Sequence, residues 1–73
     1  MARLPVISGA DAIKAFHRAG WRAVRQSGSH VVLVKEGEDV TLSVPLRREL
    51  KRGLLRALIR DAGMSVDEFV DLL

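Results

Sequence analysis

The sequence has no cysteine and no tyrosine, and its only aromatic residues are Phe16, Trp21 and Phe69. The lack of cysteine excludes disulfide bonds and thiolate metal sites, so neither can stabilise the fold. A chain of 73 residues buries only about 60% of the surface that its unfolded form exposes. We therefore expect one domain, residues 1–73, built around a thin and mainly aliphatic core.

Long apolar runs are missing as well. No stretch reaches the ~18 consecutive apolar residues of a membrane-spanning helix. The first residues, Met1 to Pro5, lack the apolar segment of a signal peptide. Together with the absence of cysteine, these features predict a soluble cytoplasmic protein that does not bind membranes.

The charges are unevenly placed, although the net charge is only +3. Residues 47–60 carry six cations and a single anion, Glu49, which gives +5 over fourteen residues. Residues 61–73 carry four acids and no lysine or arginine. This segregation predicts one face suited to a polyanion and another suited to a different partner.

A helix is predicted near the start of the chain. Ser8 is a typical N-cap, and Asp11 stands three residues later, where it can return the bond of a capping box. Apolar residues recur at helical spacing as far as about Ala19. Gly20 then stands where a left-handed residue commonly ends a helix.

Three strand-like segments follow, at residues 21–26, 30–35 and 40–44. The first alternates imperfectly between apolar and polar residues, and Ser27-Gly28 after it predicts a tight hairpin turn. The third alternates cleanly and should bury Val40, Leu42 and Val44. Pro45 ends it, because proline cannot donate to the strand ladder. These segments predict a three-stranded antiparallel sheet.

The last third of the chain is predicted to be helical. Apolar spacing indicates a helix over residues 50–62, but Gly53 is costly inside a helix and is a possible start, which leaves Arg52 outside. Ser65 and Glu68 form a capping box for a short final helix. Its inward side chains should be Val66, Phe69, Val70 and Leu73. The expected fold is α+β, in the order α-β-β-β-α-α, with the helices on one face of the sheet.

The tripeptide Gly28-Ser29-His30 carries the main candidate for chemistry. Histidine has an ordinary pKa of ~6.5 and can both accept and return a proton near neutral pH. RNA supplies its own nucleophile, the 2′-hydroxyl, so its cleavage needs a base, an acid and a cation but no metal or other cofactor. We predict that His30 is the catalytic base and acid of a small ribonuclease. The alternative is a partly buried strand-end histidine with no catalytic role.

Several side chains are candidates for binding RNA: Arg25, Ser29, Arg47, Lys51, Arg52, Arg56 and Arg60. Three of these arginines recur every four residues and should share one face of the second helix. Guanidinium and ammonium groups stabilise the charge of a phosphate. These residues can also have purely structural roles. An amphipathic helix needs a solvated face, which arginines can provide, and a serine beside a turn glycine commonly forms a hydrogen bond with its own backbone.

Five segments, in order along nearly the whole chain, resemble the HicA toxin family. They are Leu4-Pro5-Val6-Ile7-Ser8-Gly9, Ala19-Gly20-Trp21, Arg25-Gln26-Ser27-Gly28-Ser29-His30, Val44-Pro45-Leu46, and Ala62-Gly63-Met64-Ser65 with Glu68-Phe69. The Gly-Ser-His motif is the most telling of them. The chain departs from the family at two places: many members have a histidine near Leu46 and Arg47, and a threonine at Leu54.

The resemblance implies a fold like that of the double-stranded-RNA-binding domain and a toxin that cleaves mRNA. It also implies a HicB-type antitoxin encoded beside the toxin, and it places His30 where the family has its catalytic histidine. We expect the antitoxin to cover His30 and the nearby cations, and so to block RNA sterically and by charge.

Two other functions stay open. A domain with this fold can bind RNA or a protein partner without cleaving anything. The two C-terminal helices also resemble a helix-turn-helix DNA-binding module. Against the second reading, the segment after Ser65 carries three acids and no base, so the major groove of DNA would repel it.

Overall fold

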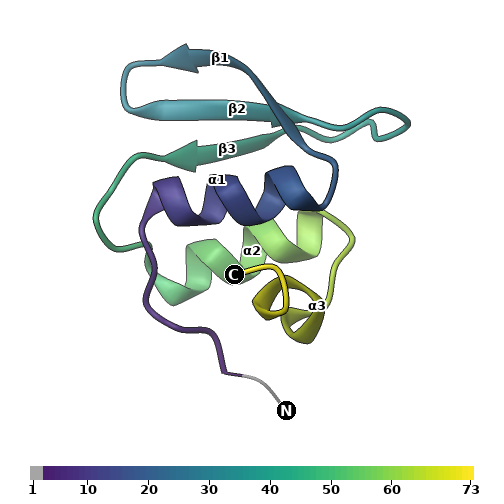
Figure 1. The fold of residues 1–73 in the computed structure, drawn as a ribbon. Helices are drawn as coiled ribbons and strands as arrows, with labels where there is room; N and C mark the ends of the chain where they lie inside the picture. Colours follow the sequence, from purple (N-terminus) through teal and green to yellow (C-terminus); the bar gives the residue numbers. More distant parts are fainter. Residues whose placement is uncertain (1–2) are drawn as a thin grey trace.

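The computed structural model describes residues 3–73, so the first two residues of the expected domain lie outside it. The predicted order of helices and strands is confirmed (Figure 1). The elements are α1 (Gly9–Arg18), β1 (Arg22–Ser27), β2 (His30–Val34), β3 (Leu42–Pro45), α2 (Arg52–Asp61) and α3 (Val66–Val70).

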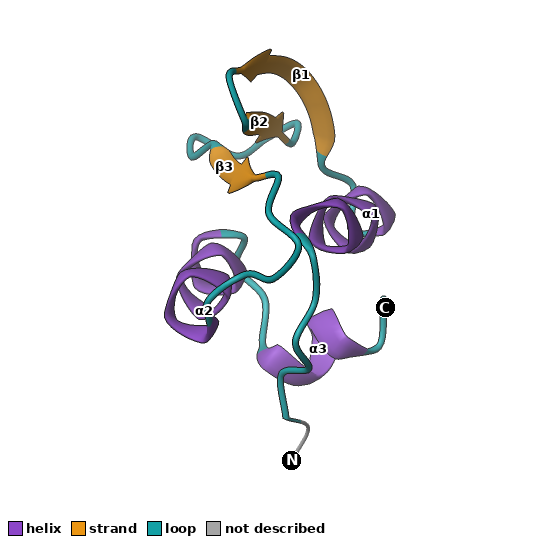
Figure 2. Cartoon of the chain, turned by 90° about the vertical axis from the view of Figure 1, so that its left-hand side faces the viewer, coloured by secondary structure: helices purple, strands orange, loops and turns teal. Residues whose placement is uncertain are grey.

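The strands form an antiparallel sheet in the order β1-β2-β3, as predicted. Helices α1 and α2 lie on the same side of this sheet, and α3 lies beyond them (Figures 1 and 2). Within residues 3–73, no helix lies on the opposite face of the sheet. The domain is therefore an α+β fold in which one face of the sheet stays open.

Local capping determines where the first helix begins and ends. The Ser8 hydroxyl accepts a hydrogen bond of 3.1 Å from the Asp11 backbone N–H. This satisfies one of the four backbone donors that a helix N-terminus leaves unpaired. After α1, Gly20 adopts a φ of +101° and turns the chain toward the sheet. The predicted N-cap and the turn at Gly20 are confirmed, but the Asp11 side chain does not return a bond to Ser8, so the capping box is only half formed.

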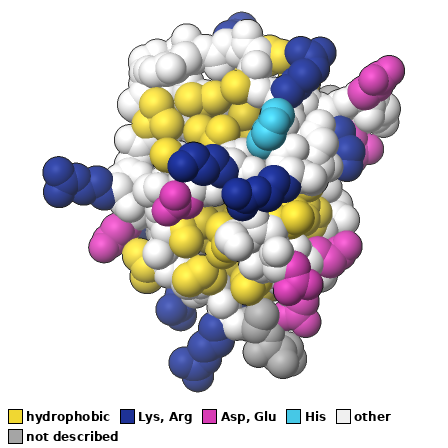
Figure 3. Space-filling model, viewed as in Figure 1, with side chains coloured by type: hydrophobic (Ala, Val, Ile, Leu, Met, Phe, Trp, Pro, Cys, Tyr) yellow, Lys and Arg dark blue, Asp and Glu magenta, His cyan; other side chains and the backbone are white. Residues whose placement is uncertain are grey.

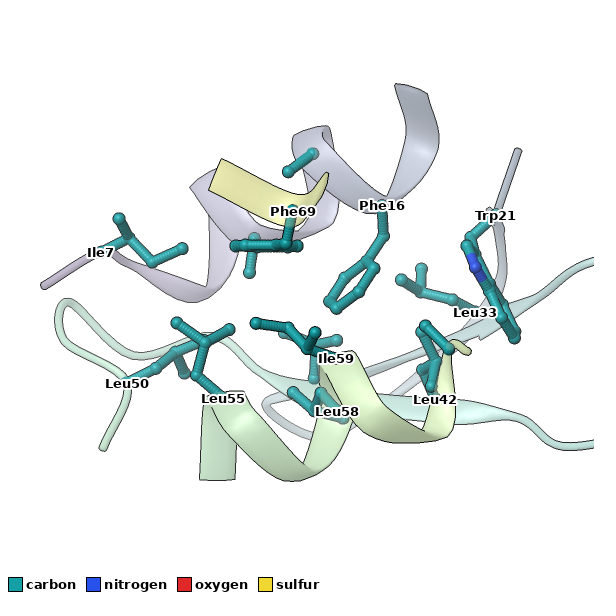
Figure 4. Packing of buried hydrophobic residues seen from close by; sticks show 14 of the residues in the cluster. Ile7, Phe16, Trp21, Leu33, Leu42, Leu50, Leu55, Leu58, Ile59 and Phe69 are labelled. Atoms are coloured by element: carbon teal, nitrogen blue, oxygen red, sulfur yellow. The ribbon is translucent and has the colours of Figure 1, made fainter. Parts of the chain in front are cut away.

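The core lies between the sheet and the helices, and Figure 4 shows its main side chains. The Phe16 and Phe69 rings are fully buried, with centroids 5.0 Å apart, and so join α1 to α3. Such a tilted pair contributes about 0.5–1.5 kcal/mol beyond the area that it buries. The rest is mainly aliphatic, as expected, and its largest fully buried members are Trp21, Leu33, Leu42, Leu55, Ile59 and Val44.

The predicted inward position of Val40 is wrong. Its side chain is 45% exposed, because residues 35–41 form the connection between β2 and β3, and pairing begins only at Leu42. That connection turns at Gly37, whose φ is +85°, and is closed by a 3.0 Å bond from the Glu38 N–H to the Lys35 carbonyl. Leu42 and Val44 are buried, as the alternation predicted.

Helix α2 begins one residue earlier than the alternative start at Gly53. Arg52 is its first residue and Gly53 its second, so Arg52 is not outside the helix. Gly53 has no positive φ, and a Cβ at this position would meet nothing within 4 Å. The fold therefore does not require a glycine there. At the other end, Gly63 has a φ of +73° and ends the helix.

The capping box of α3 is present. The Ser65 hydroxyl accepts from the Glu68 N–H at 3.1 Å, and the Ser65 N–H donates to the Glu68 carboxylate at 2.9 Å. Hydrogen bonds from Ser65 to the Glu68 carboxylate, first from its backbone N–H and then from its side chain, hold the pKa of Glu68 below its ordinary value of 4.5. The expected burial of Leu73 is wrong: α3 ends at Val70, Leu73 is 44% exposed, and Leu72 is half-buried instead. Within residues 3–73, no helix is long and apolar enough to cross a bilayer.

Candidate functional site

His30 is held at the junction of all three strands. It pairs with Ser27 of β1 on one side and with Pro45 of β3 on the other. The turn before it comprises Gly28 and Ser29, one residue later than predicted. Gly28 has a φ of +60° and Ser29 does not, which is the pattern of a type II′ turn with glycine at its first central position.

The imidazole of His30 is open to solvent. Side chains alternate along β2, and Val31 and Leu33 are buried against the helices. His30 therefore lies on the face of the sheet that no helix covers. Its side chain is exposed and makes no hydrogen bond or ion pair within residues 3–73. The reading of His30 as a partly buried residue is wrong, and its nitrogen atoms are free to contact a ligand.

A basic loop lies beside this histidine. The Leu46 N–H donates to the Ser29 carbonyl at 2.6 Å, which ties the β1–β2 turn to the loop that follows β3. The same loop is tied to the start of α1, because the Gly9 N–H donates to the Arg47 carbonyl at 2.9 Å. The first bond places Leu46, the residue before Arg47, against the turn that leads into His30, and the second fixes Arg47 against the start of α1.

The close approach of α1 to this loop depends on Gly9. A Cβ on Gly9 would lie 2.0 Å from the Pro45 carbonyl oxygen, a separation that no pair of non-bonded atoms tolerates. A further hydrogen bond of 2.8 Å, donated by the Leu50 N–H to the Ile7 carbonyl, holds the far end of the loop. The loop is therefore fixed along its length rather than free.

The start of α2 adds positive charge to the same end of the molecule. Its N-cap, Lys51, makes no side-chain capping bond, and its first turn contains no acid. Lys51 and Arg52 stand instead beside the positive end of the helix dipole, an arrangement that disfavours the helix unless an anion binds nearby. In Figure 1 the β1–β2 turn, the end of β3 and the starts of α1 and α2 all lie at the left.

Arg25 reaches the open face through an irregularity in β1. The register shifts between Ala23 and Arg25, so that Val24 is an extra residue and Arg25 pairs with Val32. Without this β-bulge, Arg25 would pair with the core-facing Val31 and point to the opposite face. The bulge explains the imperfect alternation of this segment in the sequence.

Two arginines of the predicted set lie farther away. Arg56 is one turn along α2 from Arg52, and Arg60 is two turns along, about 12 Å at 1.5 Å per residue. Arg60 also lies 3.9 Å from Asp61 in an exposed ion pair, which contributes little to stability. The structure thus brings Ser29, His30, Arg47, Lys51 and Arg52 to one end, with Arg25 on the adjoining face.

A metal-binding cluster is not found in the described part of the chain: no three His, Cys, Asp or Glu side chains come together there. The second histidine lies elsewhere. His17 is on α1, where its Nδ1 is 3.2 Å from the Trp21 carbonyl oxygen. It therefore belongs to the helix–strand junction and not to the surface around His30.

Comparison with known proteins decides the family. The family model of the HicA toxin of bacterial toxin–antitoxin systems matches residues 9–64. The chain belongs to the HicA family. Among solved structures, it is similar to a chain of a toxin–antitoxin complex from Streptococcus pneumoniae, with a TM-score of 0.70 and 27% identity over 80% of this chain and 98% of that one. Comparison with curated proteins finds no match.

The two departures from the usual HicA pattern fall at different depths. Leu46 is 42% exposed, and Arg47 follows it in the basic loop beside His30. Leu54 is half-buried and packs against the core from the first turn of α2. The first departure therefore changes the surface near His30, whereas the second adds apolar contact under the helix start.

Proposed function

We propose that this HicA-family protein is the toxin of a toxin–antitoxin system and cleaves mRNA in the cytoplasm. The observation that carries the proposal is the exposed His30, held between β1 and β3 where the basic loop after β3 is bonded to the β1–β2 turn. The family match supports the same assignment. The proposed inhibitor is a HicB-type antitoxin, in keeping with the complex to which a similar chain belongs.

In the proposed reaction, His30 removes the proton from a ribose 2′-hydroxyl. The freed oxygen attacks the adjacent phosphorus, and the bond from phosphorus to the 5′-oxygen of the next nucleotide breaks. The imidazolium returns its proton to that 5′-oxygen. The products are a 2′,3′-cyclic phosphate and a 5′-hydroxyl, and the proton balance of His30 is restored.

The cations have a separate role in this mechanism. Negative charge builds on the non-bridging phosphate oxygens as the new bond forms, and fixed positive groups stabilise it. Arg47, Lys51 and Arg52 lie at the same end of the molecule as His30 and suit this role. Arg25 and Ser29 suit the positioning of the neighbouring nucleotides. Arg56 and Arg60 then extend the RNA path along α2.

The test is cleavage of a long single-stranded RNA by the purified protein, with and without EDTA. His30→Ala should abolish cleavage while keeping its circular dichroism spectrum, since an exposed side chain changes stability by roughly 0.5 kcal/mol or less. His17→Ala is the matched control and should cleave normally. Cleavage by His30→Ala at the wild-type rate contradicts the mechanism.

The alternatives make different predictions in the same assay. A non-catalytic domain retains RNA in a salt-sensitive manner but produces no fragments with either protein. The DNA-binding reading is disfavoured by α3, which has only five residues, carries Asp67 and Glu68 in its first turn and buries Phe69. Such a helix has neither the length nor the charge to enter a major groove.

A further inference from the structure

The helix-facing side of β1 is left bare by the fold. Ala23 pairs with Leu33, and directly paired residues share one face of the sheet, here the face toward the helices. Leu33 is 1% exposed, whereas every residue of β1, Ala23 included, is exposed. Helix α1 thus does not cover the edge strand β1, even on the face of the sheet that the helices occupy.

A hollow of about 280 Å³ opens between α1 and this bare strand. Its apolar lining comes from Ile13, Trp21, Ala23 and Leu33. A cavity of ~150 Å³ lined by similar side chains accommodates benzene, so this hollow has room for a ring or a branched aliphatic side chain. An open apolar hollow of this kind suits an anchor residue from a protein partner.

Cations border the hollow. Lys14 and Arg18 line it, and both also line a second hollow on the other side of α1, of about 370 Å³, which includes Pro5, Ile7 and Leu73. Figure 3 shows two apolar patches separated by a band of basic side chains. Within residues 3–73 neither cation forms an ion pair, although the Arg18 guanidinium donates a hydrogen bond to the Leu72 carbonyl and Asp11 also lines the second hollow.

We infer that the hollow beside Ala23, together with Lys14 and Arg18 at its border, is a docking surface for the antitoxin, separate from the site at His30. The occupant is a segment that places an apolar side chain in the hollow beside Ala23 and sets Asp or Glu opposite Lys14 and Arg18. Such a segment fits apolar walls with a cationic border better than RNA does, because bases bind by stacking on exposed aromatic faces and Trp21 in this lining is only 1% exposed. The inference rests on the proposed function, which supplies the antitoxin.

The docking surface and the proposed catalytic site are distinct in space. His30 lies on the open face of the sheet, and the hollow lies on the helix-covered face. Along β2, His30 and Leu33 are three residues apart, roughly 10 Å at 3.3 Å per residue. An antitoxin that covers His30 would therefore gain a second point of attachment, and changes in the hollow should weaken its binding without affecting cleavage.

The experiment measures antitoxin affinity and RNA cleavage for three variants. Ala23→Arg fills the hollow, Lys14→Glu reverses the charge at its border, and Val40→Arg places the same new side chain in the exposed β2–β3 connection as a control. The antitoxin Kd should rise at least tenfold for the first two variants and less than twofold for Val40→Arg. Cleavage without antitoxin should stay within twofold of wild type for all three.

Other outcomes overturn the inference. If wild type binds the antitoxin and Ala23→Arg and Lys14→Glu bind it equally well, the hollow is not part of the interface. If wild type binds no antitoxin, the partner assignment fails too, while the cleavage assay still reports on the toxin activity. If sedimentation shows a wild-type dimer that Ala23→Arg dissociates, the occupant is a second copy of this chain and not the antitoxin.

Discussion

Replacement of Gly9 by alanine should loosen the contact that holds the basic loop beside His30. The added Cβ would lie 2.0 Å from the Pro45 carbonyl oxygen and 3.2 Å from the Leu46 Cα. Both are backbone atoms, so no flexible side chain can move aside. The start of α1 and the end of β3 must separate, and the 2.9 Å bond from the Gly9 N–H to the Arg47 carbonyl lengthens or breaks.

The expected loss of stability follows from three effects. Overpacking costs about 1–3 kcal/mol, and a lost hydrogen bond costs about 0.5–1.5 kcal/mol. Alanine returns at most about 1 kcal/mol of helix propensity relative to glycine, and less at the first helical residue. The net destabilisation is about 0.5–4.5 kcal/mol, which lowers Tm by roughly 4–8 °C for each kcal/mol in a domain of this size.

Thermal unfolding followed by circular dichroism measures this change directly. Gly53→Ala is the matched control, because a Cβ there meets nothing within 4 Å and the residue has no positive φ. That substitution should raise stability by up to about 1 kcal/mol. A Gly9→Ala protein as stable as wild type, or more so, would refute the reasoning.

Two further predictions concern charge. The pKa of Glu68 is lowered in the folded state, first by the Ser65 backbone N–H and then by the Ser65 hydroxyl. The ionised Glu68 carboxylate therefore stabilises the fold above pH 4.5, and this contribution is lost as the pH falls through the lowered pKa. Wild-type Tm should therefore fall more steeply below pH 4.5 than that of Glu68→Gln, and parallel curves would contradict this. For RNA retained by a cleavage-deficient His30→Ala protein, the slope of log affinity against log salt should shrink by about 0.7 in Arg52→Gln, the value for one phosphate on a single strand. Arg60→Gln should also shrink the slope, because the proposed RNA path runs along α2 to this residue, and an unchanged slope in Arg60→Gln would show that the path ends before it.

Local signals in the sequence determined most of the fold. The caps at Ser8 and Ser65 and the glycines after α1 and α2 act within three or four residues, so a short stretch of sequence contains all the information they need. Strand alternation likewise identified Leu42 and Val44 as core residues. It failed for Val40, because the length of the β2–β3 connection depends on where the two strands pair.

The sequence also singled out His30, but only the tertiary structure decided what surrounds it. The loop that contains Arg47 is bonded to the turn before His30 and to the start of α1, segments that are distant in the chain, and Gly9 permits the close approach of α1 to this loop. The β-bulge in β1 determines the face on which Arg25 lies. The hollow beside Ala23 exists because two helices do not cover three strands completely. Each of these features depends on register and packing between elements, which no local pattern of residues specifies.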